Sequence, residues 1–137
     1  MTLALRAGRL TTGLLAGSAA LLSGVLAAQS AAAFSARFSW RGIPACGTVS
    51  PAFALKGVPR GTASLSFALR DRDAPEFQHG GATLPYAGRG IVPKGAVAYT
   101  GPCPPKGASH HYIWTIHALD AHGTDLDMTE AAGAYPR

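Results

Sequence analysis

The clearest alternation of apolar and polar residues lies at 63–73. Every second position there is apolar, at Leu65, Phe67 and Leu69, which is the period of a half-buried strand. Continuing that phase places Asp71 and Asp73 on the inward side of the strand. Carboxylates in that position are costly to desolvate unless they meet donors, cations or a water-filled cavity. The end of this strand is therefore a candidate site.

The segment 110–119 alternates in the same way. One phase is bulky and aromatic, consisting of His110, Tyr112, Trp114, Ile116 and Ala118, so we expect it to face the core. His110 and Tyr112 then lie at the end of one core face, as the two carboxylates lie at the end of another. His110 could instead be a core histidine that bonds a backbone carbonyl.

The segments between these strands are rich in turn residues, and the chain holds 17 Gly and 10 Pro. Such residues specify loops and do not join central ladders. No helix of ordinary length is predicted after Ala33. The segment from Thr124 to Ala134 is open to two interpretations, a short helix or a final edge strand. The pattern favours a single, loop-rich, all-β domain.

The first 33 residues have the features of a signal peptide. Arg6 and Arg9 give a basic start, Leu10 to Ala28 is apolar, and Ser30 to Ala33 are small. We expect cleavage near Ala33, which leaves a domain at 34–137 that is periplasmic or secreted. The alternative is that the segment stays uncleaved as a membrane anchor.

Charge excludes one class of partner. The chain has 12 Lys and Arg against 7 Asp and Glu, and Arg6 and Arg9 lie in the predicted leader. The remaining domain is only mildly basic, and its cations are scattered without interleaved aromatic residues. Nucleic acid is therefore not an expected partner.

Export also sets the interpretation of Cys46 and Cys103, the two cysteines of the chain. They belong to no C-x-x-C or zinc-spaced cluster, so an oxidising compartment predicts a disulfide between them. Two separate buried thiols are the alternative.

Several short motifs occur in an order that carries a family resemblance. They are Ser50-Pro51-Ala52-Phe53, Gly57 to Thr62, Ser64-Leu65, Asp71-Arg72-Asp73-Ala74-Pro75, His79-Gly80-Gly81, Gly101 to Gly107 and His110-His111-Tyr112. Across about residues 46 to 120, this ordered set resembles the phosphatidylethanolamine-binding protein family, which includes bacterial proteins called Raf kinase inhibitor-like. The short chain, with Arg72 where longer members have Pro, resembles the exported bacterial branch.

The resemblance implies a large antiparallel sheet packed on a smaller one, without a C-terminal helix, and an anion-binding pocket at one end. Carried over position by position, the implied pocket residues are Asp71, Asp73, Pro75, His79, Gly101, Pro104, His110 and Tyr112. The two histidines, the tyrosine hydroxyl and the backbone N–H groups from Gly101 to Cys103 would donate to the anion. The two Asp side chains would orient the imidazoles, although Asp73 could simply fix a turn.

We therefore expect a non-catalytic domain that binds a small anionic or phospho-type ligand and needs no cofactor. One alternative is a protein-interaction module that inhibits an envelope hydrolase through an exposed apolar loop at 43–45 or 82–91. A hydrolase is disfavoured because Ser50, Thr100 and Ser109 lie in no nucleophile motif. A metal site built from Asp71, His79 and His110 has the right ligand types but no diagnostic spacing.

Overall fold

The structure is a computed structural model that describes residues 32–136, and these residues form seven β-strands and no helix. The predicted signal segment lies almost wholly outside the described residues. The strands are β1 (Ser35–Phe38), β2 (Phe53–Lys56), β3 (Ser64–Asp71), β4 (Gly81–Pro85), β5 (Ile91–Val92), β6 (His110–Leu119) and β7 (Asp125–Tyr135). The described part of the chain contains no helix that could cross a membrane.

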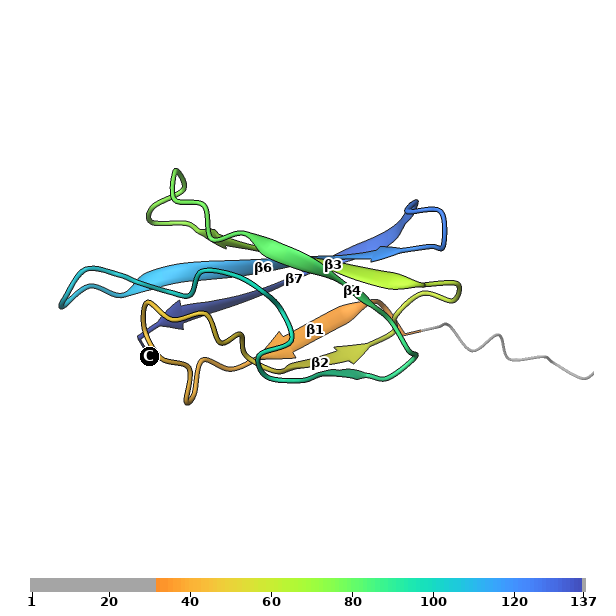
Figure 1. The fold of residues 1–137 in the computed structure, drawn as a ribbon, viewed down its shortest axis with the longest axis horizontal. Coiled ribbons are helices and arrows are strands. Elements are labelled where there is room, and N and C mark those ends of the chain that lie inside the picture. The colour runs from red at the N-terminus through yellow and green to blue at the C-terminus, as the bar shows by residue number, and fades with distance from the viewer. Residues whose placement is uncertain (1–31, 137) are drawn as a thin grey trace, which may run out of the picture.

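The strands form two antiparallel sheets that face each other (Figure 1). The larger sheet has the order β4-β3-β6-β7 and the smaller has the order β1-β2-β5. This arrangement confirms the predicted large sheet packed on a smaller one. The segment from Thr124 to Ala134 belongs mostly to β7, which pairs with β6 at the edge of the larger sheet, so the edge-strand interpretation is the correct one.

The pairing of β3 with β6 brings the predicted site together. Asp71 lies opposite Tyr112 in this ladder. The end of β3 and the beginning of β6 therefore lie together at one end of the sandwich, although about forty positions of the chain separate them.

An aromatic cluster fills the space between the sheets. Trp114 is fully buried, with its ring centroid 5.1 Å from Phe53, 5.1 Å from Tyr99 and 6.3 Å from Phe67. The alternation predicted for 63–69 is confirmed because Leu65, Phe67 and Leu69 are all buried. Aromatic pairs at these separations add to the burial of apolar surface in holding the sheets together.

The two long edges of the sandwich differ. At one edge β1 contacts β7, and the Trp40 Nε1–H donates to the Gly133 carbonyl at 3.3 Å. A Cβ at Gly133 would lie 3.1 Å from the Phe38 ring, so glycine permits this close approach. The Tyr135 hydroxyl adds a bond of 3.0 Å to the Ile43 carbonyl. At the other edge lie β4 and β5, which have no such connection among the hydrogen bonds of residues 32–136.

Candidate functional site

A pocket of about 320 Å³ lies where β3 ends and β6 begins. Three segments build it: the end of β3 with the loop that follows, the loop before β6, and the first residue of β6. Its lining residues are Asp71, Ala74, Glu76, Phe77, His79, Cys103, Pro105 and His110. The pocket thus combines two carboxylates and two imidazoles with apolar walls.

Asp71 organises one side of this pocket. Its side chain is buried, and Oδ2 accepts a hydrogen bond from His110 Nδ1 at 2.7 Å. Oδ1 accepts the N–H groups of Asp73 at 2.8 Å and Ala74 at 3.2 Å. Burial by itself raises the pKa of Asp71, but the bonds from His110 and the Asp73 N–H outweigh it and lower the pKa below its ordinary value. The carboxylate is therefore ionised at neutral pH and holds His110 with Nδ1 protonated.

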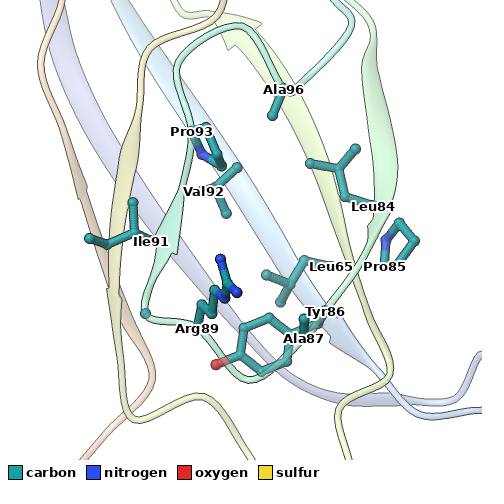
Figure 2. A pocket seen from close by; sticks show the side chains of 11 residues that line it. Leu65, Leu84, Pro85, Tyr86, Ala87, Arg89, Ile91, Val92, Pro93 and Ala96 are labelled. Atoms are coloured by element: carbon teal, nitrogen blue, oxygen red, sulfur yellow. The ribbon is translucent and has the colours of Figure 1, made fainter.

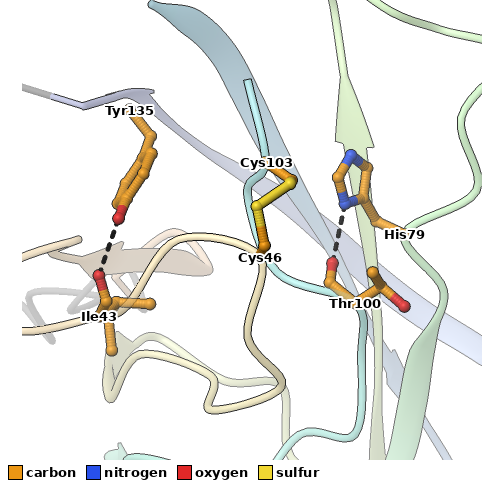
Figure 3. Close-up of a disulfide and its surroundings, with 6 residues drawn as sticks. All are labelled: Ile43, Cys46, His79, Thr100, Cys103 and Tyr135. Carbon is orange, nitrogen blue, oxygen red and sulfur yellow. Dashed lines mark hydrogen bonds between the residues drawn. A yellow bond between two sulfur atoms is a disulfide. The ribbon is translucent and has the colours of Figure 1, made fainter. Parts of the chain in front are cut away.

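His79 also lines the pocket, and it lies beside the disulfide (Figure 3). Its Nδ1 donates to the Thr100 carbonyl at 2.8 Å, and the Thr100 N–H donates back to the His79 carbonyl at 2.8 Å. Because a carbonyl can only accept, the proton of the neutral ring is on Nδ1. His79 Nε2 is buried and has no hydrogen-bond partner among the described residues. The ring is thus fixed with a free nitrogen.

Tyr112 lies beside the two imidazoles, although it is not itself one of the lining residues. Its ring lies 5.4 Å from that of His79 and 6.3 Å from that of His110. The hydroxyl is buried near the Asp71 carboxylate. Burial, with the negative charge of Asp71 adding to it, raises the pKa of Tyr112 above its ordinary value. The phenol is therefore neutral and keeps a proton to donate.

The predicted disulfide between Cys46 and Cys103 is present (Figure 3). Two backbone bonds flank it, from the Cys46 N–H to the Pro102 carbonyl at 2.8 Å and from the Gly101 N–H to the Gly47 carbonyl at 2.7 Å. A Cβ at Gly101 would lie 2.6 Å from the Gly47 oxygen, so only glycine permits this approach. The expectation that the Gly101 N–H faces a ligand is wrong, since that group is already bonded.

Asp73 does not lie on the inward side, and the prediction from strand phase is wrong for this residue. The strand ends at Asp71, whose Oδ1 turns the chain by accepting the next N–H groups. Asp73 is exposed and accepts the N–H of His111 at 2.6 Å and His111 Nδ1 at 3.1 Å. These two bonds lower the pKa of Asp73 below its ordinary value, and the bond from the backbone N–H has the larger effect. Asp73 thus fixes the loop from outside the pocket.

The remaining predicted residues divide between the walls and their neighbours. Pro75 and Pro104 are not among the lining residues, but the residues on either side of Pro75 line the pocket, as do those on either side of Pro104. Sequence reasoning missed Glu76 and Phe77. A signal was available for Phe77, which is a large apolar side chain in a polar loop and is 48% exposed.

The structure also bears on the alternatives. In the segment 43–45 Ile43 is buried while Pro44 and Ala45 are exposed, and in the segment 82–91 Ile91 is 68% exposed. The Ser50 hydroxyl accepts the Val97 N–H, and the Ser109 hydroxyl donates to the Pro136 carbonyl. Within residues 32–136, no three His, Cys, Asp or Glu side chains converge as metal ligands would.

The sandwich with a pocket at one end defines a ligand-binding or interaction domain, and comparisons with known proteins specify its family. A family model described as phosphatidylethanolamine-binding protein matches residues 79–135. The UPF0098 protein YbhB of Escherichia coli strain K12 is 33% identical over an alignment of 102 residues, and the match covers 58% of this chain and 65% of that protein. A UPF0098 protein of Methanothermobacter thermautotrophicus is 32% identical over an alignment of 105 residues, and the match covers 61% of this chain and 67% of the relative.

The chain therefore belongs to the phosphatidylethanolamine-binding protein family, whose members are generally non-catalytic binding proteins. It spans about two thirds of the length of these curated relatives.

Solved structures agree on the fold. The crystal structure of Escherichia coli YbcL, described as a new member of the mammalian family, superposes with a TM-score of 0.51 at 23% identity, over 65% of this chain and 80% of that one. The crystal structure of CT736 from Chlamydia trachomatis, described as a phosphatidylethanolamine-binding protein homolog, superposes with a TM-score of 0.56 at 19% identity, over 75% of this chain and 98% of that one.

Proposed function

We propose that the polar pocket binds a small anionic or phospho-type ligand without chemical turnover. The observation that carries this proposal is His79 Nε2, a buried ring nitrogen with no partner within residues 32–136. A buried polar atom without a partner costs free energy, and a bound ligand that supplies one removes that cost.

The negative charge of the pocket determines which donors an anionic ligand needs. The pocket is lined by the carboxylates of Asp71 and Glu76, which repel an anion. An anion therefore requires protonated donors, and His79 Nε2 becomes one when the ring takes up a proton. The Thr100 carbonyl already holds Nδ1, so Nε2 is the nitrogen left for the ligand. We expect the anion to accept a hydrogen bond from His79 Nε2–H.

The other groups complete the donor set. Asp71 is a positioning residue in this proposal, because it holds His110 Nδ1 at 2.7 Å and leaves the other ring nitrogen of His110 for the pocket. The neutral Tyr112 hydroxyl supplies a further donor next to both imidazoles.

We also infer that the protein is exported to the periplasm or secreted. The disulfide between Cys46 and Cys103 supports this inference, because such bonds persist in oxidising compartments. The absence of a hydroxyl nucleophile from the pocket lining supports binding without turnover, since neither Ser50, Thr100 nor Ser109 lies in it.

A thermal-shift titration of the full chain tests the proposal, with phosphate, phosphorylethanolamine and acetate as probes. A ligand of the folded state raises Tm by mass action. We expect phosphate and phosphorylethanolamine to raise Tm. Zn²⁺ with and without EDTA serves as a metal control.

The informative variant is His79→Asn. The Asn amide nitrogen takes the place of Nδ1 and can still donate to the Thr100 carbonyl, while the Nε2 position is lost. We expect a folded protein that no longer responds to phosphate. His122→Asn, at an exposed residue of the turn between β6 and β7, is the matched control and should respond as the unmodified chain does. No response of the unmodified chain to any anion would overturn the proposal and favour a protein-interaction module.

A further inference from the structure

A second and larger cavity lies between the two sheets at the edge formed by β4 and β5 (Figure 2). Its volume is about 800 Å³, which lies in the range of cavities that enclose small organic ligands. Its walls come mainly from Leu65, Leu84, Tyr86, Ile91, Val92 and Ala96. None of its lining residues is shared with the polar pocket.

The cavity is open because the smaller sheet ends early at this edge. The edge strand β5 is only two residues long, and Pro93 follows it directly. Proline lacks the N–H needed to continue a ladder. Pro85 ends β4 on the facing sheet in the same way. Ile91 is consequently left 68% exposed on the rim.

One cation lies at this apolar cavity. Arg89 is an exposed lining residue, and it forms no ion pair with any carboxylate of residues 32–136. Figure 2 shows its guanidinium between Tyr86 and Val92, beside Leu65. No Asp or Glu lines the cavity. Apolar walls with one unpaired guanidinium are complementary to a molecule that has an alkyl chain and one carboxylate.

We propose that this cavity binds a single-chain fatty acid, with its alkyl chain between the sheets and its carboxylate paired with Arg89. The alkyl chain lies against the partly buried Leu84 and Tyr86 and covers the exposed Ile91, and so completes the sandwich at the edge where β4 and β5 leave it open. The proposal does not rest on the function proposed for the polar pocket, since the two sites are built from different residues.

Calorimetric titration of the full chain with dodecanoate, below its micelle-forming concentration, tests the proposal. Acetate and dodecanol separate the contributions of charge and chain. We expect dodecanoate to bind most tightly, dodecanol more weakly and acetate not measurably. Octanoate and decanoate should follow in order of length, with each methylene contributing up to about fourfold in affinity.

Amide NMR spectra locate the bound molecule. Dodecanoate should shift the signals of Leu84, Val92 and Ala96 and leave those of His79 and His110 unchanged. Shifts confined to the polar pocket, or no binding of dodecanoate, would overturn the proposal. A dimer in sedimentation experiments that persists when dodecanoate is added would also overturn the proposal, because a second copy of the chain would then cover the exposed Ile91.

Arg89→Gln isolates the charge. We expect it to weaken dodecanoate binding about fivefold and to leave dodecanol binding unchanged. Arg60→Gln, at an exposed arginine that lines neither cavity, is the matched control and should change neither affinity. Ala96→Phe tests the chain site, since a ring at that position occupies the cavity and should abolish binding of both ligands. Equal affinities of the unmodified and Arg89→Gln proteins for dodecanoate would contradict the assigned role of Arg89.

Discussion

The polar pocket and the apolar cavity differ in how the chain holds them together. The Cys46–Cys103 disulfide, the Asp71–His110 pair and the His79–Thr100 bonds fix the walls of the polar pocket. The apolar cavity lies between two edge strands, and no hydrogen bond joins β4 to β5 in the described chain. The walls of one site are cross-linked, whereas no hydrogen bond between strands joins the walls of the other in residues 32–136.

The specific interactions of this small domain are unevenly distributed over the fold. Cross-links and buried hydrogen bonds gather at the end of the sandwich where β3 meets β6, and at the edge where β1 meets β7. Substitutions in the polar pocket should therefore change both stability and binding. Substitutions of the exposed residues at the apolar cavity should change binding alone.

The largest expected effect comes from replacing Cys46 and Cys103 together by Ser. Their bond closes a segment with a sequence separation of 57, and its loss should lower the free energy of unfolding by about 4 kcal/mol in the chain-entropy model. Urea unfolding measures this change. Phosphate binding should weaken because Cys103 lines the polar pocket, while dodecanoate binding by the folded fraction should persist. Equal loss at both sites would contradict the proposed independence of the sites.

Asp71→Ala should have the next largest effect. It leaves the Asp73 and Ala74 N–H groups and His110 without their acceptor, which should cost about 3 kcal/mol. Asp73→Ala is the matched control, and its cost should be much smaller because Asp73 is exposed to water. Urea unfolding of both variants checks the order. A larger cost for Asp73 would show that the external loop, and not the buried pair, holds this end of the sandwich.

The pH dependence of the free energy of unfolding should show the contribution of the ionised Asp71. The folded-state pKa of Asp71 lies below its ordinary value of 3.8, so its ionised form stabilises the fold. That contribution is fully present above pH 3.8 and is lost as pH falls through the lowered folded-state value. In urea melts of the unmodified chain and Asp71→Asn, the difference in stability should narrow below pH 3.8. A difference that stays constant to pH 2 would contradict the ionised assignment.

The smallest effect is expected at the apolar cavity. Arg89→Gln should change the free energy of unfolding by less than about 0.5 kcal/mol, because Arg89 is exposed and forms no ion pair among the described residues. The same urea unfolding experiment measures it. A loss comparable to that of Asp71→Ala would mean that Arg89 holds the β4 and β5 edges together, and the two regions would then not differ as described.

Sequence patterns predicted the polar pocket because alternation carries its main residues. The phases of 63–73 and 110–118 placed Asp71, His110 and Tyr112 at the ends of inward faces, and the family resemblance placed them in one pocket. The β3–β6 register, with Asp71 opposite Tyr112, brings these two ends together. The phase failed at Asp73, since hydrogen bonds of the Asp71 side chain end the strand two residues earlier. Gly101 was predicted as a pocket residue, but the structure requires glycine there because the Gly47 carbonyl approaches closely.

The apolar cavity could not be predicted in this way. Leu65 and Leu84 read as ordinary inward residues of strands. Whether they are covered depends on which strands become sheet edges and on how early β5 ends, and both are consequences of the tertiary arrangement. The exposed Ile91 was noted only as part of an apolar loop.

The most direct test of the central claim is the hydrogen bonding of His79 Nε2, measured by ¹⁵N NMR of the imidazole side chains with and without phosphate. We predict that saturating phosphate shifts the Nε2 signal, because the ligand becomes the hydrogen-bond partner that this nitrogen lacks among the described residues, while Nδ1 stays bonded to Thr100. Phosphate binding that leaves the His79 ring nitrogens unchanged would contradict the account.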